Sequence, residues 1–267
     1  MKYLKIKYLV KGLLLTSILC GCKKVINLNL SNAAPQTVII GEVNNRQGPY
    51  TVTISKSVNY SSDNVFPPVS GAFVTISGNG VVDTLSETTP GGYTTHNLVG
   101  KPGESYSLYV SAEGKVYTAT SLMPEQVHLG SRSFMSGFNN NFFAVANFQD
   151  PPGVANYYEF IEYANGVRFN DGRGVSVFDD RLSDGRYINR LLYDDSADIK
   201  PGIKLRVQMN CIDAAVYNYW NELLQISSGG AGFSSPTPAN PTSNITGGAL
   251  GYFSAFSESG KSIQIPD

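Results

Sequence analysis

The sequence is poor in cysteine and histidine, which limits the chemistry available to it. Its 267 residues include 3 Cys and 2 His. The two histidines, His96 and His128, have no Cys, His or Asp cluster beside them at the spacing that zinc sites use. Neither stands in a motif that pairs a nucleophile with its base. We therefore expect no metal site and no catalytic residues.

Charge is also scarce. Charged residues make up 15% of the chain, and the formal net charge is -1. Nucleic-acid binding requires clusters of Lys and Arg that attract the phosphate backbone. The chain has no such clusters, so we expect no nucleic-acid partner. A relaxed phosphate-loop pattern spans 255–262, but too few residues follow it to form the helix that such a loop requires. We expect no bound cofactor.

Long apolar runs are missing too, because none approaches the ~20 residues of a membrane-spanning helix. At the start of the chain, four lysines precede a short apolar run over 12–19, and Gly21 stands directly before Cys22. This order is typical of a secretory signal. It resembles a bacterial lipoprotein signal, in which the cysteine after the small residue carries lipid. A transmembrane anchor and an ordinary cleaved signal with an accidental cysteine are the alternatives.

Lipid on Cys22 would attach the mature chain to a membrane, because two or more acyl chains give stable binding. We expect residues 1–22 to be the signal and residues 23–35 a tether. Lys23 and Lys24 occupy the positions where similar lipoproteins carry acidic residues when they reach the outer face. We predict a lipid-anchored protein of the outer membrane, with the periplasmic and cell-surface faces as alternatives. Cys211 is then the only free cysteine, so no internal disulfide forms.

Residues 36–125 alternate apolar and polar side chains with period two. Strands are expected around Val38 and Ile40, Tyr50 to Ser55, Ala72 to Ile76, and Tyr106 to Val110. Turn dipeptides such as Asn79-Gly80 and Glu113-Gly114 separate these strands. Short strands at this spacing predict an antiparallel β-sandwich of immunoglobulin or transthyretin type.

A second β-rich domain is expected over 126–267, after a polar junction near Pro124 to Gly130. Its clearest strands are Phe142 to Phe148, Tyr157 to Tyr163, and Ile203 to Cys211. On the last strand we expect Cys211 to be a buried apolar residue rather than a nucleophile. Asp213 can cap one helix near 214–226. The predicted fold class is mostly β, with two antiparallel sandwiches and one helix in the second.

Two groups of side chains have both a functional and a structural interpretation. Trp220, with Tyr217 and Tyr219, would suit sugar stacking, but it shares an apolar stripe with Leu223, so we expect burial against a sheet. The aspartates at 179, 180 and 184, and those at 194, 195 and 198, would suit calcium, but they lack the alternating ligand spacing of a calcium loop. We expect exposed acidic loops there.

The segment from Ser227 to Ser243 is long, uncharged and rich in Gly, Ser and Pro. Loops of this length inside a compact domain are usually functional or disordered. Phe233 is the one large apolar side chain within it, and we take it as a candidate partner contact. A disordered loop without partners is the alternative.

Several motifs resemble a family of bacterial lipoproteins called domain of unknown function 4249. They are Asp150-Pro-Pro-Gly153 with Asn156-Tyr-Tyr-Glu-Phe160, the Asp213 to Trp220 helix start, the Ser243 to Ser254 ending, and Gly41, Gly71-Ala72, Gly103 and Tyr106. The resemblance extends over nearly the whole chain. It implies an outer-membrane lipoprotein, often encoded beside transporters driven through TonB, with no established enzyme activity or ligand.

Our leading hypothesis is a non-catalytic binding or accessory subunit of a TonB-dependent outer-membrane transporter. The alternative is a structural or adhesive envelope protein with no transport role. A hydrolase ranks third, because the sequence contains no nucleophile elbow or zinc motif. Paired carboxylates such as Asp179 and Asp180 are the feature that keeps a hydrolase among the hypotheses.

The anchoring prediction has a direct test. Cys22→Ala should release the protein from the membrane fraction or leave an unprocessed precursor, because no other segment is expected to hold a bilayer. Fractionation and mass spectrometry of the N-terminal peptide measure both outcomes. Unchanged membrane partition without acyl mass on that peptide would contradict lipid anchoring.

Overall fold

The computed structural model describes residues 34–59, 63, 65–130, 134–136, 142–169, 175–192, 199–227 and 240–266. Cys22, Phe233 and the predicted signal lie outside these ranges, as does most of the loop from Ser227 to Ser243. The described chain is mostly β with one helix, as the sequence predicts. Within these residues, no helix has the length and apolar character needed to cross a membrane.

The first half of the described chain contains eight strands. They are β1 (Thr37–Asn44), β2 (Thr51–Lys56), β3 (Phe73–Gly78), β4 (Val81–Thr84), β5 (Ser86–Thr89), β6 (Gly92–Thr94), β7 (Ser105–Ala112) and β8 (Lys115–Leu122). Strands β4, β3, β7 and β8 form one antiparallel sheet, in that order. Strands β1, β2, β6 and β5 belong to a second, larger sheet.

A first hydrophobic core uses the inward side chains of these strands. On β7 the expected alternation is confirmed, because Tyr106, Leu108 and Val110 are all buried. On β1 the prediction chose the wrong face: Ile39 and Val43 are fully buried, whereas Ile40 is 38% exposed. The run from Val38 to Ile40 is apolar throughout, so alternation alone could not identify the inward positions.

Tyr106 also fixes the loop before its own strand. Its hydroxyl accepts a hydrogen bond from the Lys101 backbone N–H at 2.7 Å. A buried tyrosine that bonds to backbone a few residues upstream is a recurring feature of immunoglobulin-like sandwiches. The contact agrees with the predicted type of the first sandwich.

The second half contains β9 (Phe134–Ser136), β10 (Phe142–Gln149), β11 (Tyr157–Ala164), β12 (Val167–Arg168), β13 (Val175–Asp179), β14 (Tyr187–Leu191), β15 (Lys204–Ile212) and β16 (Leu250–Gln264). Strands β14, β10 and β9 form a separate sheet, and β12, β11, β15 and β16 continue the large one. A second core lies here, and Leu205, Val207, Met209 and Cys211 share its face of β15 as predicted. Cys211 is 2% exposed, and burial raises the pKa of its thiol.

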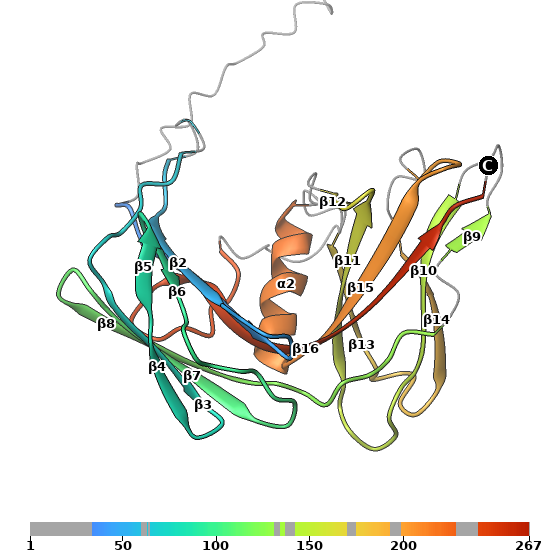
Figure 1. Cartoon of the computed structure of the whole chain (residues 1–267), viewed down its shortest axis with the longest axis horizontal. Helices are drawn as coiled ribbons and strands as arrows, with labels where there is room; N and C mark the ends of the chain where they lie inside the picture. Colours follow the sequence, from blue (N-terminus) through green and yellow to red (C-terminus); the bar gives the residue numbers. More distant parts are fainter. Residues whose placement is uncertain are drawn as a thin grey trace, which may run out of the picture. The chain divides into compact units, whose positions relative to one another are not determined.

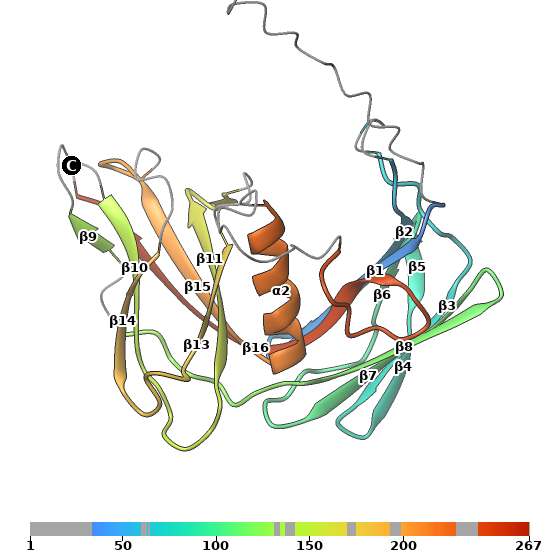
Figure 2. The same ribbon diagram turned by 180° about the vertical axis from the view of Figure 1, so that it is seen from behind.

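The single described helix, α2 (Ala214–Ser227), begins where the sequence places it. Asp213 caps it, because its Oδ1 accepts a hydrogen bond from the Val216 N–H at 2.9 Å. The apolar side of α2 packs on the large sheet, where Val216 and Trp220 join Tyr252 of β16 in a third hydrophobic cluster. Figures 1 and 2 show the helix against β16 from opposite sides.

Strand β16 connects the two halves. Its first part pairs in parallel with β1, from Val38↔Leu250 to Asn44↔Phe256. Its second part pairs antiparallel with β15, from Cys211↔Ser257 to Lys204↔Gln264. Phe253 and Ala255 belong to the first core, so that core contains residues from the end of the chain as well as from 36–125. Figure 1 shows β16 as the long red strand that runs from one group of strands to the other.

The β1–β16 contact gives a stability prediction. Gly251 has a φ of +93°, and a Cβ there would lie 2.0 Å from the Ile39 carbonyl oxygen. Gly251→Ala should therefore lower the free energy of unfolding by at least about 3 kcal/mol, from backbone strain plus displacement of β1. Urea denaturation measures the change.

Gly248→Ala is the matched control. Gly248 also has a positive φ, +80°, but a Cβ there would meet nothing within 4 Å. Its substitution should cost only the strain of a left-handed residue, about 1 kcal/mol. If both variants lower the free energy of unfolding equally, the close approach of β1 to β16 adds nothing to the cost of the Gly251 substitution.

Candidate functional site

An apolar pocket lies where the two halves of the described chain meet. Its cavity volume is about 440 Å³, within the usual range of ligand sites. Three segments line it: 122–125 after β8, Pro151 with 154–157 before and into β11, and 212–214 at the start of α2; Gly103 completes the wall. The rim carries exposed apolar side chains, since Leu122 is 48% exposed and Val154 is 59% exposed.

A buried carboxylate holds the loop that forms one wall. Asp150 is 0% exposed. Its Oδ1 accepts a hydrogen bond from the Tyr158 hydroxyl at 2.5 Å, and its Oδ2 accepts one from the Gly185 N–H at 2.9 Å. Burial, followed by this bond to Asp150, raises the pKa of Tyr158. The two ends of the loop are therefore fixed to each other and to the turn after β13.

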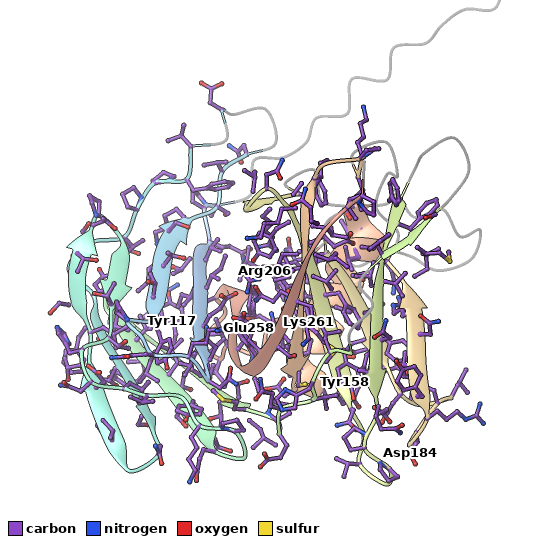
Figure 3. All side chains as sticks on the ribbon, turned by 45° about the vertical axis from the view of Figure 1, so that its right-hand side comes forward. Tyr117, Tyr158, Asp184, Arg206, Glu258 and Lys261 are labelled. Atoms are coloured by element: carbon purple, nitrogen blue, oxygen red, sulfur yellow. The ribbon has the colours of Figure 1, made fainter. Side chains whose placement is uncertain are left out.

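Two further aspartates from that turn bind the same loop. Asp180 accepts a hydrogen bond from the Asn156 N–H at 3.0 Å, and Asp184 accepts one from the Gly153 N–H at 2.7 Å. In Figure 3, Tyr158 and Asp184 lie toward the same end of the second half. The expectation of exposed acidic loops is confirmed for Asp184 but wrong for Asp180, which is only 3% exposed, and for Asp179, which lies in β13 with its side chain 11% exposed. Asp194, Asp195 and Asp198 lie outside the described residues.

The three aspartates lie close enough together to offer oxygens to a divalent cation. Carboxylate atoms of Asp150, Asp180 and Asp184 all fall within 4.8 Å of one another. Burial raises the pKa of Asp180, and the neighbouring carboxylates of Asp150 and Asp184 raise it further. Each carboxylate already accepts a hydrogen bond from the protein, so we assign the cluster the structural role of holding the 150–156 loop.

The opposite wall is fixed by the cap of α2. The Asp213 Oδ2 accepts a hydrogen bond from the Ser121 hydroxyl at 2.5 Å. The Ser121 oxygen in turn accepts one from the Ala255 N–H at 2.9 Å, which ties the helix start to β8 and β16 together. Tyr157 packs against Tyr217 of α2 with ring centroids 5.1 Å apart. The walls are held from both sides by buried contacts, so the pocket is preorganised.

The walls of the pocket are mostly apolar. No Ser, Thr, Cys, His or Lys is among its lining residues in the described chain. The ionisable groups of its walls are the carboxylates of Glu125 and Asp213 and the hydroxyl of Tyr157. An apolar group of a ligand or partner that enters this pocket leaves water, and its transfer contributes favourably to the free energy of binding.

Elsewhere, the structure forms a Ser–His–Asp arrangement that sequence analysis missed. The Ser86 Oγ lies 3.0 Å from His96 Nε2, and His96 Nδ1 lies 3.3 Å from Asp83 Oδ1. These distances resemble those of a nucleophile, its base and an orienting carboxylate. The three residues come from β4, β5 and the loop after β6, and no familiar motif spacing connects them in the sequence.

The Asp83 carboxylate is mainly occupied in holding a turn. Its Oδ2 accepts hydrogen bonds from the backbone N–H groups of His96, Asn97 and Leu98 at 2.6 to 2.9 Å. Burial alone would raise its pKa, but these three donors together hold the pKa below its usual value. His96 is about half exposed, with 48% of its side chain accessible. We interpret the arrangement as a turn cap with a surface histidine.

A second pocket, of about 360 Å³, lies beside the end of α2 and is lined by Arg168, Phe169, Val175, Trp220, Leu223, Leu224 and Ser227. The predicted burial of Trp220 against a sheet is confirmed in part: its ring centroid lies 5.6 Å from that of Tyr252 on β16, but the side chain is only partly buried. One edge of Trp220 faces this pocket as well. Segments outside the described ranges follow Phe169 and Ser227 directly.

A family model described as Domain of unknown function (DUF4249) matches residues 23–262. The chain belongs to this family. No curated protein matches the chain. Of the motifs that carry the resemblance, three meet at the apolar pocket: the Asp150 to Gly153 and Asn156 to Phe160 segment, the helix start at Asp213, and Gly103. Three of the segments on which the resemblance rests thus contribute to the walls of one cavity.

The turn-cap interpretation of Asp83 gives a pH prediction. Asp83→Asn should lower the free energy of unfolding by about 2 kcal/mol at pH 7, because three backbone donors lose an ionised acceptor. The contribution of the carboxylate is complete above its unfolded pKa of about 3.9 and is lost as pH falls through the lower folded pKa. The difference between variant and wild type should therefore shrink in acid, as urea titrations at several pH values would measure.

Ser86→Ala is the control for this prediction. Ser86 is exposed on its strand, so removing its hydroxyl should change the stability by less than about 0.5 kcal/mol. If Asp83→Asn lowers the free energy of unfolding by the same amount at every pH, the Asp83 carboxylate does not act as the ionised cap of this turn.

Proposed function

We propose that this DUF4249 protein is a lipid-anchored envelope protein of the outer membrane that acts by non-covalent contact, as a binding or accessory subunit of a TonB-dependent outer-membrane transporter. The observation that carries the binding part is the preorganised apolar pocket, to whose walls three of the segments behind the resemblance contribute. The anchoring and transporter parts are supported by the sequence around Cys22 and by the resemblance described above.

The pocket has the properties of a contact site for a partner. A fixed concave wall with exposed apolar residues at its rim, here Leu122 and Val154, can receive an apolar side chain without rearranging. The buried bonds of Asp150 and Asp213 hold the two sides of the pocket. An anchored protein with such a site can remain beside a membrane partner while binding it.

The structural or adhesive alternative is favoured by a different surface. The outward positions of the β4-β3-β7-β8 sheet carry no charged residue; they are Phe73, Thr75, Ser77, Val82, Thr84, Ser105, Ser107, Tyr109, Ser111, Val116, Thr118, Thr120 and Leu122. Phe73 and Tyr109 pack edge to face on it, with ring centroids 6.3 Å apart. A neutral, hydroxyl-rich face of this kind suits adhesion to other uncharged surfaces.

Affinity purification distinguishes the two functions. After extraction in mild detergent, the wild-type protein should recover one TonB-dependent barrel protein. Val154→Lys should reduce that recovery at least about tenfold, because it places a charge at the apolar rim of the pocket. Quantitative mass spectrometry of the purified material measures the ratio.

Val82→Lys is the matched control, since Val82 is 71% exposed on the neutral sheet face. It should leave recovery of the barrel protein unchanged. If wild-type protein emerges alone under conditions that preserve other envelope complexes, the accessory-subunit proposal fails and the structural function takes its place.

A further inference from the structure

The polar part of the pocket lining is acidic. Glu125 and Asp213 are its charged residues, and no Lys or Arg belongs to the described lining. Glu125 is exposed at the rim, where its Oε1 would lie 2.8 Å from a Cβ placed on Gly103. Behind the wall stand the aspartates that hold the 150–156 loop. The pocket thus combines apolar walls with negative charge on one side.

The negative charges of the pocket have neutral partners. Asp213 accepts from a serine hydroxyl and a backbone N–H. The Asp150 carboxylate accepts from a tyrosine hydroxyl and a backbone N–H. Among the ion pairs between described residues, none includes Glu125, Asp213 or Asp150. Because Asp213 caps the positive end of the α2 dipole and Asp150 is fully buried, the exposed Glu125 is the carboxylate whose field favours a cation at the mouth of the pocket.

We propose that the pocket binds a peptide segment of a partner protein in which a large apolar side chain stands next to a lysine or arginine. The apolar side chain enters between Val154, Tyr157 and Met123, and the basic group stays at the rim beside Glu125. This inference rests on the proposed function only in taking the pocket as the contact site for a partner.

Charge complementarity selects this occupant over the others. An anionic group beside the apolar side chain would meet Glu125 and be repelled, while a neutral one would gain only the apolar contact. A free fatty acid is disfavoured by its carboxylate for the same reason. A second copy of this chain would have to present a basic residue beside an exposed apolar one, and the test below separates that outcome from a peptide partner.

Ligand-observed saturation-transfer NMR on the full lipidated chain in detergent tests the proposal. The probe is the peptide acetyl-Gly-Phe-Arg-Gly-amide, which should bind with a dissociation constant of about 1 mM, as expected for one side chain in a pocket. Acetyl-Gly-Phe-Glu-Gly-amide and acetyl-Gly-Ser-Arg-Gly-amide should each bind at least about tenfold more weakly, because one has the wrong charge and the other lacks the apolar group.

Three variants locate the binding. Ala155→Trp fills the pocket and should abolish saturation transfer to the phenylalanine ring. Glu125→Gln should weaken binding of the arginine peptide about threefold and reduce its dependence on salt. Glu113→Gln removes an exposed carboxylate that pairs with Lys56 at the hairpin between β7 and β8, away from the pocket lining, and should leave peptide binding unchanged. Far-ultraviolet circular dichroism confirms that each variant is folded.

The outcomes separate this inference from the proposed function. Equal binding of the arginine and glutamate peptides, or binding that survives Ala155→Trp in a folded variant, would overturn the inference. Concentration-dependent dimerisation abolished by Ala155→Trp, without peptide binding, would show that the occupant is a second copy and would overturn it as well. Selective binding of the arginine peptide with no barrel protein recovered would support the inference while the transporter role fails.

Discussion

The double pairing of strand β16 is the constraint on which the rest of the structure depends. One uninterrupted strand supplies a parallel neighbour to β1 and an antiparallel neighbour to β15. Its middle is a junction as well. The Glu258 carboxylate accepts a hydrogen bond from Arg206 at 2.7 Å and forms an ion pair with Arg46 at 2.9 Å, and the Glu258 backbone N–H donates to Asn45. Figure 3 shows Glu258 beside Arg206. Neither core can be complete without this strand.

The pocket is a consequence of the same junction. Because β16 brings the two halves together, the segment after β8 comes to lie against the loop before β11 and the start of α2. The Ser121 hydroxyl on β8 donates to Asp213, the cap of α2, and accepts from the Ala255 N–H on β16. A single side chain therefore links β8, α2 and β16. The negative charge in this region therefore has two uses, since Asp150, Asp180 and Asp213 fix backbone while Glu125 supplies the field at the pocket.

Local patterns in the sequence predict most of the elements but few of the contacts between them. Alternation identifies β7 and β15 together with their inward faces, and the cap at Asp213 identifies the helix, because both signals act over a few residues. The hydrogen bond from the Asn156 N–H to Asp180, which holds the 150–156 loop, joins residues 24 positions apart, and no local pattern in the sequence predicts it. Strand β16 continues through Ser259, Gly260 and Lys261 because these residues pair with β15, and no local signal in the sequence marks that pairing.

The order of strands also determines how the chain bears tension. The described chain enters the fold at β1, and β1 is held along its length by seven parallel register pairs with β16 and by antiparallel pairs with β2. A pull along the axis of β1 acts across these hydrogen bonds, in shear, so the pairs must break together rather than one after another. A chain tethered to a membrane through its N-terminus would therefore transmit force into the centre of its largest sheet and resist being unravelled from that end.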